Sequence, residues 1–170
     1  GVLLLKGLQL IIKRVFDVGV SLIMLILLLP LFLFVAVAIK LDSKGPVFFI
    51  QERVGKDKRH FKILKFRTMK INTPDLPTHL LKNPDSYITR VGRVLRLTSL
   101  DELPQLINIL RGDMSFVGPR PALHNQHDLI QLRDIRGINS IKPGLTGWAQ
   151  VNGRDGLSII EKVGKDGFYL

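Results

Sequence analysis

Hydrophobic positions are concentrated in one run of the chain, residues 18 to 39, which holds 22 residues without a charge and is interrupted by Pro30. At a rise of ~1.5 Å per residue, an unbroken helix of this length would just cross a hydrocarbon core of ~30 Å. Proline lacks an N–H, and its ring would clash with the carbonyl of Ile26, so we expect a kink or a break there. Two arrangements stay open: a kinked helix that spans a membrane, or a helix-break-helix that enters and leaves it on one face.

Positive charge flanks this run on both sides, so neither end has the excess that usually orients a spanning helix. The flanking basic residues are Lys6, Lys13, Arg14, Lys40, Lys44, Arg53 and Lys56. This balance favours a hairpin with both ends cytoplasmic, and a single-pass anchor stays open. We expect no cleaved signal peptide, because the run is too long and no small-residue cleavage pattern follows it. Residues 2 to 16 predict either an amphipathic lead-in whose basic residues meet lipid phosphates, or an extension of the membrane helix.

After the long run the pattern changes to short stretches of β-branched and aromatic residues. Residues 47 to 54 and 61 to 69 flank a turn that contains Gly55, which predicts a β-hairpin. Lys65 and Arg67 lie on its second strand and have two interpretations. They belong to a solvated basic strand, or they point at a bound phosphate.

Helical spacing returns after a loop that three prolines predict at residues 71 to 87. Within residues 88 to 97, Val91, Val94 and Leu95 share one helical face. The arginines of this segment lie on another side, where they need water or an anionic neighbour: Arg90, Arg93 and Arg96.

A second helix follows, and two adjacent carboxylates, Asp101 and Glu102, lie at its start. Ser99 and Glu102 have the spacing of a capping box, which would begin the helix at Ser99; alternatively it begins near Leu103. Its apolar face comprises Leu103, Leu106, Ile107 and Leu110. In either case the helix dipole should stabilise both anions and keep them ionised. First turns favour acidic residues for this reason alone, so the pair does not by itself demand a function.

Composition limits what this protein can be. The chain has 170 residues, no cysteine and a formal net charge of +11. We expect one membrane element, residues 1 to 44, and one small α+β domain, residues 45 to 170, which is largely helical with a β-hairpin on the membrane surface. The lack of cysteine excludes disulfides, thiolate zinc sites and cysteine nucleophiles. The positive charge suits anionic lipid, a phosphorylated substrate or nucleic acid, and does not choose among them.

The basic residues near the carboxylate pair indicate a possible chemical role for it. Hard oxygen ligands suit Mg²⁺ and arginines suit phosphate oxygens, so Asp101 and Glu102 are equipped to hold the ion together with a phosphate. An ionised Asp101 can also attack phosphorus and form an acyl-phosphate. The arginines near this pair in the sequence are Arg90, Arg93, Arg96 and Arg111.

Six ordered motifs resemble those of the bacterial sugar transferases, the monotopic polyprenyl-phosphate phosphoglycosyl transferases that start the assembly of bacterial polysaccharides. The motifs are residues 13–17 (KRVFD), 44–49 (KGPVFF), 65–69 (KFRTM), 98–106 (TSLDELPQL), 112–121 (GDMSFVGPRP) and 143–154 (PGLTGWAQVNGR). The resemblance extends from about residue 13 to residue 169. It implies that a sugar-1-phosphate passes from a UDP-sugar to undecaprenyl phosphate, with release of UMP and with Mg²⁺ as cofactor.

The resemblance also implies roles for particular residues. Asp101 would be the nucleophile that carries the phospho-sugar, and Glu102 would assist through Mg²⁺ or the acceptor phosphate. The phosphates would face Lys65, Arg67, Arg96 and Arg120. The nucleotide side would be served by Asn152 and Arg154.

The family places its re-entrant helix, broken at the proline, in the bacterial inner membrane among anionic lipids, with the catalytic domain on the cytoplasmic face. A serine commonly precedes this proline in the family, whereas Leu29 does here, and the family usually continues with another membrane-associated segment beyond residue 170. The alternative from another class is a membrane-anchored basic module that binds without catalysis, although sparse aromatic residues argue against nucleic acid as its ligand. The sequence identifies neither the sugar nor the oligomeric state.

Overall fold

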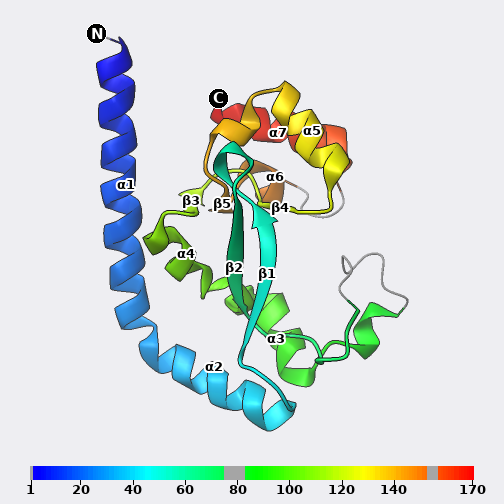
Figure 1. Cartoon of the computed structure of the whole chain (residues 1–170). Helices are drawn as coiled ribbons and strands as arrows, with labels where there is room; N and C mark the ends of the chain where they lie inside the picture. The colour runs from blue at the N-terminus through cyan, green and yellow to red at the C-terminus, as the bar shows by residue number, and fades with distance from the viewer. Residues whose placement is uncertain (1, 75–82, 153–156) are drawn as a thin grey trace. The chain divides into compact units, whose positions relative to one another are not determined.

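The computed structural model describes residues 2–74, 83–152 and 157–170, with the backbone alone over residues 2–6 (Figure 1). It is a mixed α+β structure, as the sequence predicts. The helices are α1 (Val2–Leu27), α2 (Leu29–Asp42), α3 (Arg90–Thr98), α4 (Gln105–Arg111), α5 (His127–Ile135), α6 (Trp148–Val151) and α7 (Ile159–Asp166). The strands are β1 (Phe48–Val54), β2 (His60–Phe66), β3 (Ser115–Val117), β4 (Ala122–Leu123) and β5 (Gly144–Thr146).

The predicted hairpin is confirmed, because β1 and β2 are neighbours in the sheet. Two features of the sheets were not predicted. Strand β4 pairs antiparallel with β1, opposite Arg53 and Val54, which gives the order β2-β1-β4. Strands β3 and β5 form a separate parallel pair. Two or three residues carry too little periodicity to be recognised as strands.

The helix break is also confirmed. Helix α1 ends at Leu27, and Pro30 lies in the first turn of α2, where a missing N–H leaves no hydrogen bond unmade. Phe32 N donates to Leu28 O at 2.9 Å and closes this turn. Within the described residues no single helix has the length and hydropathy to cross a membrane. Residues 7–27 and 29–42 have that length and hydropathy only when they are taken together, and the two helices are bent by 61° at the break.

The chain divides into two compact units. The first comprises residues 1–24, 51–63 and 105–170, and the second comprises residues 25–50 and 64–104. Each unit therefore takes segments from both sides of residue 44. The division at residue 44 into a membrane element and a catalytic domain stays a prediction about where the membrane lies.

In the first unit, α1 is attached by the basic residues that we expected to meet lipid. Arg14 donates to Ile109 O at 2.6 Å and to Leu110 O at 2.7 Å, at the end of α4. Lys13 donates to Ser115. These two residues hold the helix to its own domain, and their contact with lipid stays a prediction. The core of this unit comprises Val54, Ala122, Leu129, Ile138 and Val163.

Helix α4 buries a different face from the predicted one. Its buried residues are Gln105, Leu106, Asn108 and Ile109, whereas Ile107 and Leu110 are half-buried. Asn108 Nδ2 donates to Lys62 O at 2.8 Å. A hydrogen-bonded amide can replace a hydrophobic side chain in a core, and apolar spacing does not reveal this.

In the second unit, Phe66 of β2 packs between Phe32 of α2 and Phe48 of β1, with ring centroids 5.2 and 5.5 Å apart. The core around it comprises Val35, Ile39 and Leu95. Asp42 Oδ2, at the end of α2, accepts from Val91 N at 2.9 Å, at the start of α3. Helices α2 and α3 are thereby joined by apolar packing and by a capping hydrogen bond.

Candidate active site

The two adjacent carboxylates lie in a 3₁₀ turn, Leu100–Glu102, that follows α3 in the second unit. Ser99 ends α3 in the left-handed conformation, with φ 58°, and makes no capping hydrogen bond to this turn. The predicted capping box is therefore wrong. Helix α4 begins only at Gln105, close to the alternative start near Leu103. A tight left-handed corner presents Asp101 and Glu102 here, not the first turn of a helix.

Lys65 and Glu102 form an ion pair, with 2.8 Å between Lys65 Nζ and Glu102 Oε1. The two side chains are only 14% and 20% exposed. Lys65 is thus no solvated strand residue, which removes one of the two interpretations of this lysine. Such a shielded pair is screened less by salt than a surface pair.

Burial raises the pKa of Asp101 above its ordinary value of 3.8. The charge of Lys65 opposes this rise, Glu102 adds to it, and Arg96 opposes it again. The pKa of Asp101 is thus raised and not lowered as a helix dipole would lower it, because loss of water outweighs the favourable charges. Burial likewise lowers the pKa of Arg96, against the effect of Asp101.

Arg96 reaches this site because α3 lies directly against the end of the hairpin. Arg96 Nε donates to Thr68 Oγ1 at 2.9 Å, and Thr89 N donates to Thr68 O at 3.0 Å. A Cβ at Gly92 would lie 2.1 Å from Thr68 O, so only glycine permits this approach. Thr68 was not predicted to lie at this site, although a glycine within a helical pattern was a signal of close packing.

The side chain of Arg67 makes hydrogen bonds within the protein. Its side chain is buried, and all three guanidinium nitrogens donate within the protein: Nε to Pro46 O at 2.6 Å, Nη1 to Ser43 Oγ at 2.9 Å and Nη2 to Ser43 O at 2.9 Å. Arg67 therefore holds the turn between α2 and β1. Its role toward a phosphate stays a prediction.

On α3 the apolar face is narrower than predicted. Leu95 and Gly92 are buried, whereas Val94 is exposed. Arg90 and Arg93 are exposed, as expected for a solvated face, and Arg96 is half-buried. The three arginines are therefore not equivalent.

The remaining predicted site residues belong to the first unit or fall outside the described residues. Arg120 is exposed, and its carbonyl accepts from Arg133 Nη1 at 2.9 Å. Asn152 Nδ2 donates to Trp148 O at 2.9 Å. Arg154 lies outside the described residues. The roles of these three residues stay predictions.

The donor set at the 3₁₀ turn fits a magnesium ion that is shared with a substrate. Nowhere in the described part of the chain do three or more His, Cys, Asp or Glu side chains form a group that could hold a metal. Mg²⁺ usually keeps several waters and binds through one or two carboxylates together with substrate phosphates. Asp101 and Glu102 would supply that number of carboxylates, and Lys65 and Arg96 would supply charge for phosphate oxygens.

Comparison with known proteins agrees with the motif pattern. The sequence model described as "Bacterial sugar transferase" matches residues 8–170. The UDP-glucose:undecaprenyl-phosphate glucose-1-phosphate transferase of Escherichia coli (strain K12) is 43% identical over 164 residues, which cover 95% of this chain and 35% of the relative. The UDP-N-acetylgalactosamine-undecaprenyl-phosphate N-acetylgalactosaminephosphotransferase of Aeromonas hydrophila is 44% identical, over 89% of this chain and 36% of the relative.

The uncharacterized sugar transferase EpsL of Bacillus subtilis (strain 168) is 41% identical, over 95% of this chain and 78% of the relative. The chain thus spans about a third of the length of the Escherichia coli and Aeromonas relatives and most of the Bacillus one. Both the family match and these identities extend over nearly the whole chain. The chain belongs to the bacterial sugar transferase family.

Proposed function

We propose that this chain is the catalytic part of a phosphoglycosyl transferase that moves a sugar-1-phosphate from a UDP-sugar to undecaprenyl phosphate and releases UMP. The names of the curated relatives support the two substrates, and they differ in the sugar, which is glucose in one and N-acetylgalactosamine in another. One structural observation carries the proposal: a half-buried carboxyl, Asp101, lies among two cations and a second carboxyl.

In the proposed reaction Asp101 is the nucleophile. Its carboxylate oxygen bonds to the β-phosphorus of the UDP-sugar, and the bond from that phosphorus to the oxygen bridging the two phosphates breaks. UMP leaves with the electron pair, and the phospho-sugar stays on Asp101. A phosphate oxygen of undecaprenyl phosphate then attacks the same phosphorus and releases the carboxylate.

The raised pKa of Asp101 suits this role. A carboxylate that has lost part of its hydration is a stronger nucleophile than a solvated one, and it still ionises because Lys65 and Arg96 oppose the effect of burial. Attack on a phosphate brings two anions together, and the same cations reduce that repulsion. Lys65 is itself held in place by Glu102.

Asp101 and Glu102 are the residues that would hold Mg²⁺. When bound, the ion would neutralise charge on the phosphate oxygens and on the leaving UMP. Glu102 thereby has two tasks in the proposal, as a partner of Lys65 and as a metal ligand. Arg120, Asn152 and Arg154 are assigned to the phosphate and nucleotide side by the motif resemblance alone.

We further propose that α2 and the helix break enter the cytoplasmic leaflet of the bacterial inner membrane and return on the same face. The support is the break at Pro30 and the row of apolar side chains that α2 leaves exposed. These are Leu29, Leu33, Phe34, Val37 and Leu41. Exposed apolar surface of this extent is unusual for a protein surrounded by water. Anionic lipid would suit the net charge of +11.

UMP release tests the reaction. The protein is incubated with Mg²⁺, undecaprenyl phosphate and a panel of UDP-sugars, and UMP is measured. We expect release with at least one donor. We also expect a phospho-sugar adduct on Asp101, visible by mass spectrometry when undecaprenyl phosphate is omitted.

Asp101→Asn should abolish both signals, while Asp128→Asn, an exposed carboxylate on α5, should leave both unchanged. An active Asp101→Asn variant would exclude covalent catalysis through Asp101. Failure of every donor with folded protein would leave the binding module as the better description.

Accessibility labelling tests the membrane arrangement. Single cysteines at positions 7 and 44, in a chain that has none of its own, are labelled from one side of sealed vesicles. We expect both to react from the same side. Reaction from opposite sides would restore the plain spanning anchor.

A further inference from the structure

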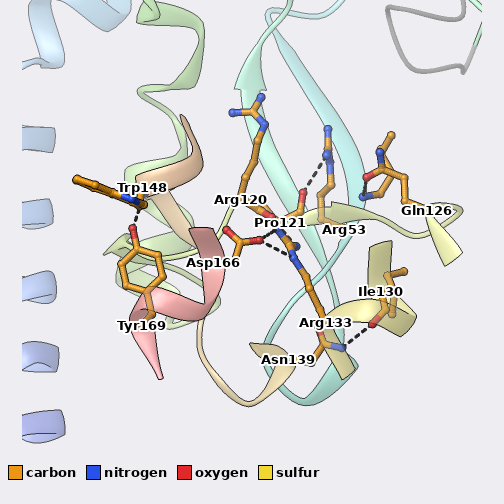
Figure 2. Close-up of polar contacts among 11 residues, drawn as sticks. Arg53, Arg120, Pro121, Gln126, Ile130, Arg133, Asn139, Trp148, Asp166 and Tyr169 are labelled. Atoms are coloured by element: carbon orange, nitrogen blue, oxygen red, sulfur yellow. Dashed lines mark hydrogen bonds and ion pairs between the residues drawn. The ribbon is translucent and has the colours of Figure 1, made fainter. Parts of the chain in front are cut away.

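The first unit contains a buried ion pair that the proposed reaction does not use. Arg133 of α5 donates from Nε at 2.9 Å and from Nη2 at 2.5 Å to Asp166 Oδ2, at the end of α7 (Figure 2). The two side chains are 7% and 1% exposed. No motif of the sequence analysis includes either residue.

The third nitrogen of Arg133 connects this pair to Arg120, a residue that is predicted to bind phosphate. Arg133 Nη1 donates to Arg120 O at 2.9 Å, so the guanidinium bridges the Asp166 carboxylate and the backbone of Arg120. Figure 2 shows the side chain of Arg120 extending away from the ion pair. The pair thus contacts the backbone of Arg120 and leaves its guanidinium to point elsewhere.

The backbone on both sides of Arg120 is held in the same manner. Gly144 N donates to Pro119 O at 2.9 Å. Arg53 Nη1 donates to Pro121 O at 3.0 Å, as Figure 2 shows. Three consecutive carbonyls therefore accept hydrogen bonds, and two prolines fix φ beside Arg120. This segment is ordered before any ligand binds, which lowers the entropy lost when Arg120 is held against one.

Stability alone does not account for the pair. An acidic residue at the C-terminal end of a helix is unfavourable to the helix dipole, and Asp166 is the last residue of α7. Burial raises the pKa of Asp166 even though Arg133 opposes that rise. Asp166 Oδ1 is buried and has no hydrogen-bond partner among the described residues. A well-packed apolar pair is often as stable as a buried ion pair, or more so.

We propose that Arg133, held by Asp166, is a positioning residue for Arg120: it fixes the backbone from which Arg120 reaches a phosphate of the UDP-sugar. This inference rests on the proposed function, which gives Arg120 a phosphate to bind. It adds Arg133 and Asp166, which lie outside the six motifs, to the residues that support substrate binding.

A double-mutant cycle tests the inference. We expect Arg133→Met to lower kcat/KM for the UDP-sugar by about 10- to 100-fold, since small misplacements of a positioning group have effects of this size. In an Arg120→Ala background, which keeps the carbonyl, Arg133→Met should change kcat/KM by less than about twofold, because the group that it positions is gone. Thermal unfolding of each variant shows whether the fold is retained.

A matched control comes from the same helix. Lys58 and Asp134 form an exposed ion pair, with 2.7 Å between Lys58 Nζ and Asp134 Oδ2, one residue after Arg133. Asp134→Asn should leave kcat/KM unchanged in both backgrounds. If Arg133→Met does not fold, the double variant Arg133→Met with Asp166→Leu replaces it in the cycle. The double variant removes both charges and so leaves neither ion buried without a partner.

The outcomes separate the two proposals. Equal losses from Arg133→Met in both backgrounds would mean that Arg133 acts without Arg120, and would overturn the positioning role while the proposed reaction stands. Unchanged activity in Arg133→Met or in Arg120→Ala would overturn it too. No UMP release by the wild-type protein from any UDP-sugar would overturn the proposed function, and the inference with it.

Discussion

Lys65 Nζ lies 2.8 Å from Glu102 Oε1, and this ion pair joins β2 to the turn that carries Asp101. Burial raises the pKa of Asp101, the charge of Lys65 opposes the rise, and Glu102 adds to it. The two partners of one ion pair thus act in opposite directions on the neighbouring carboxyl. How readily Asp101 ionises depends on both of them.

Replacing Lys65 should therefore affect activity through Asp101. Lys65→Met removes the largest effect that opposes burial, so the pKa of Asp101 should rise further and a smaller fraction should be ionised at neutral pH. We expect kcat/KM to fall by roughly 10- to 100-fold, with the acid limb of the pH profile displaced to higher pH. Lys62→Met, an exposed lysine of the same strand, is the control. Identical pH profiles for the two variants would contradict this role of Lys65.

The dependence of wild-type kcat/KM on pH also reports the ionisation of Asp101. If ionised Asp101 is the nucleophile, UMP release should decline as pH falls, with a midpoint above 3.8, because burial raises the pKa of this carboxyl. The rate should reach its plateau above that midpoint. The measurement is kcat/KM against pH, with the fold checked at each pH by circular dichroism. A midpoint at or below 3.8 would be inconsistent with a desolvated nucleophile.

The raised pKa also has a consequence for stability. A carboxyl whose pKa is higher in the fold than in the unfolded chain binds its proton more tightly in the fold, so its contribution to stability is lost as pH rises from its ordinary value to the raised one. Asparagine does not ionise. At pH 7 Asp101→Asn should thus unfold at a temperature at least as high as the wild type, while losing activity by roughly 10⁴-fold or more.

The stability advantage of Asp101→Asn should shrink as pH falls toward 3.8, where wild-type Asp101 is protonated in the fold. Asp134→Asn provides the opposite case. Hydrogen bonds from Lys58 and then Asn139 lower the pKa of Asp134, so that variant should lose stability at neutral pH, and only slightly at an exposed site. Thermal unfolding at pH 4 and pH 7 measures the effect of each of the two substitutions on stability. A clear fall in the unfolding temperature of Asp101→Asn at pH 7 would mean that Asp101 stabilises the fold.

Gly92 should be intolerant of any side chain. A Cβ would lie 2.1 Å from Thr68 O, so Gly92→Ala must move α3 away from Thr68 and with it Arg96. We expect a destabilisation of about 2 kcal/mol or more and a loss of activity. Gly164→Ala, in α7 with no atom within 4 Å of the added methyl, should stabilise by about 0.5–1 kcal/mol. Equal unfolding temperatures for the two variants would refute this account of the approach between α3 and Thr68.

Secondary structure could be predicted from the sequence where it depends on a residue's own backbone and its near neighbours. Pro30 cannot continue an α-helix, and the break lies beside it. The apolar pattern around Gly55 gives a hairpin, and arginines spaced along residues 88 to 97 lie on a helix. The six motifs also led to the right family. Each of these follows from short-range sterics, periodicity or motif order.

The same reasoning failed where a side chain's environment decides its role. Ser99 and Glu102 have the spacing of a capping box, yet Ser99 adopts a left-handed conformation and ends a helix. Arg67 and Arg96 have the same charge, and the motif resemblance assigns both to phosphate binding. Only the fold shows that Arg67 holds a turn and that Arg96 lies beside Asp101.

The sequence alone determined that this chain has a broken apolar helix, an α+β fold, a strong positive charge and an adjacent Asp101 and Glu102. Tertiary structure alone decided that Asp101 is desolvated, that Lys65 pairs with Glu102, and that Arg133 and Asp166, 33 positions apart, meet in a core. The physical reason is that charge type is a property of a residue, whereas burial and distance depend on segments brought together from far along the chain. A carboxyl's pKa depends on all three.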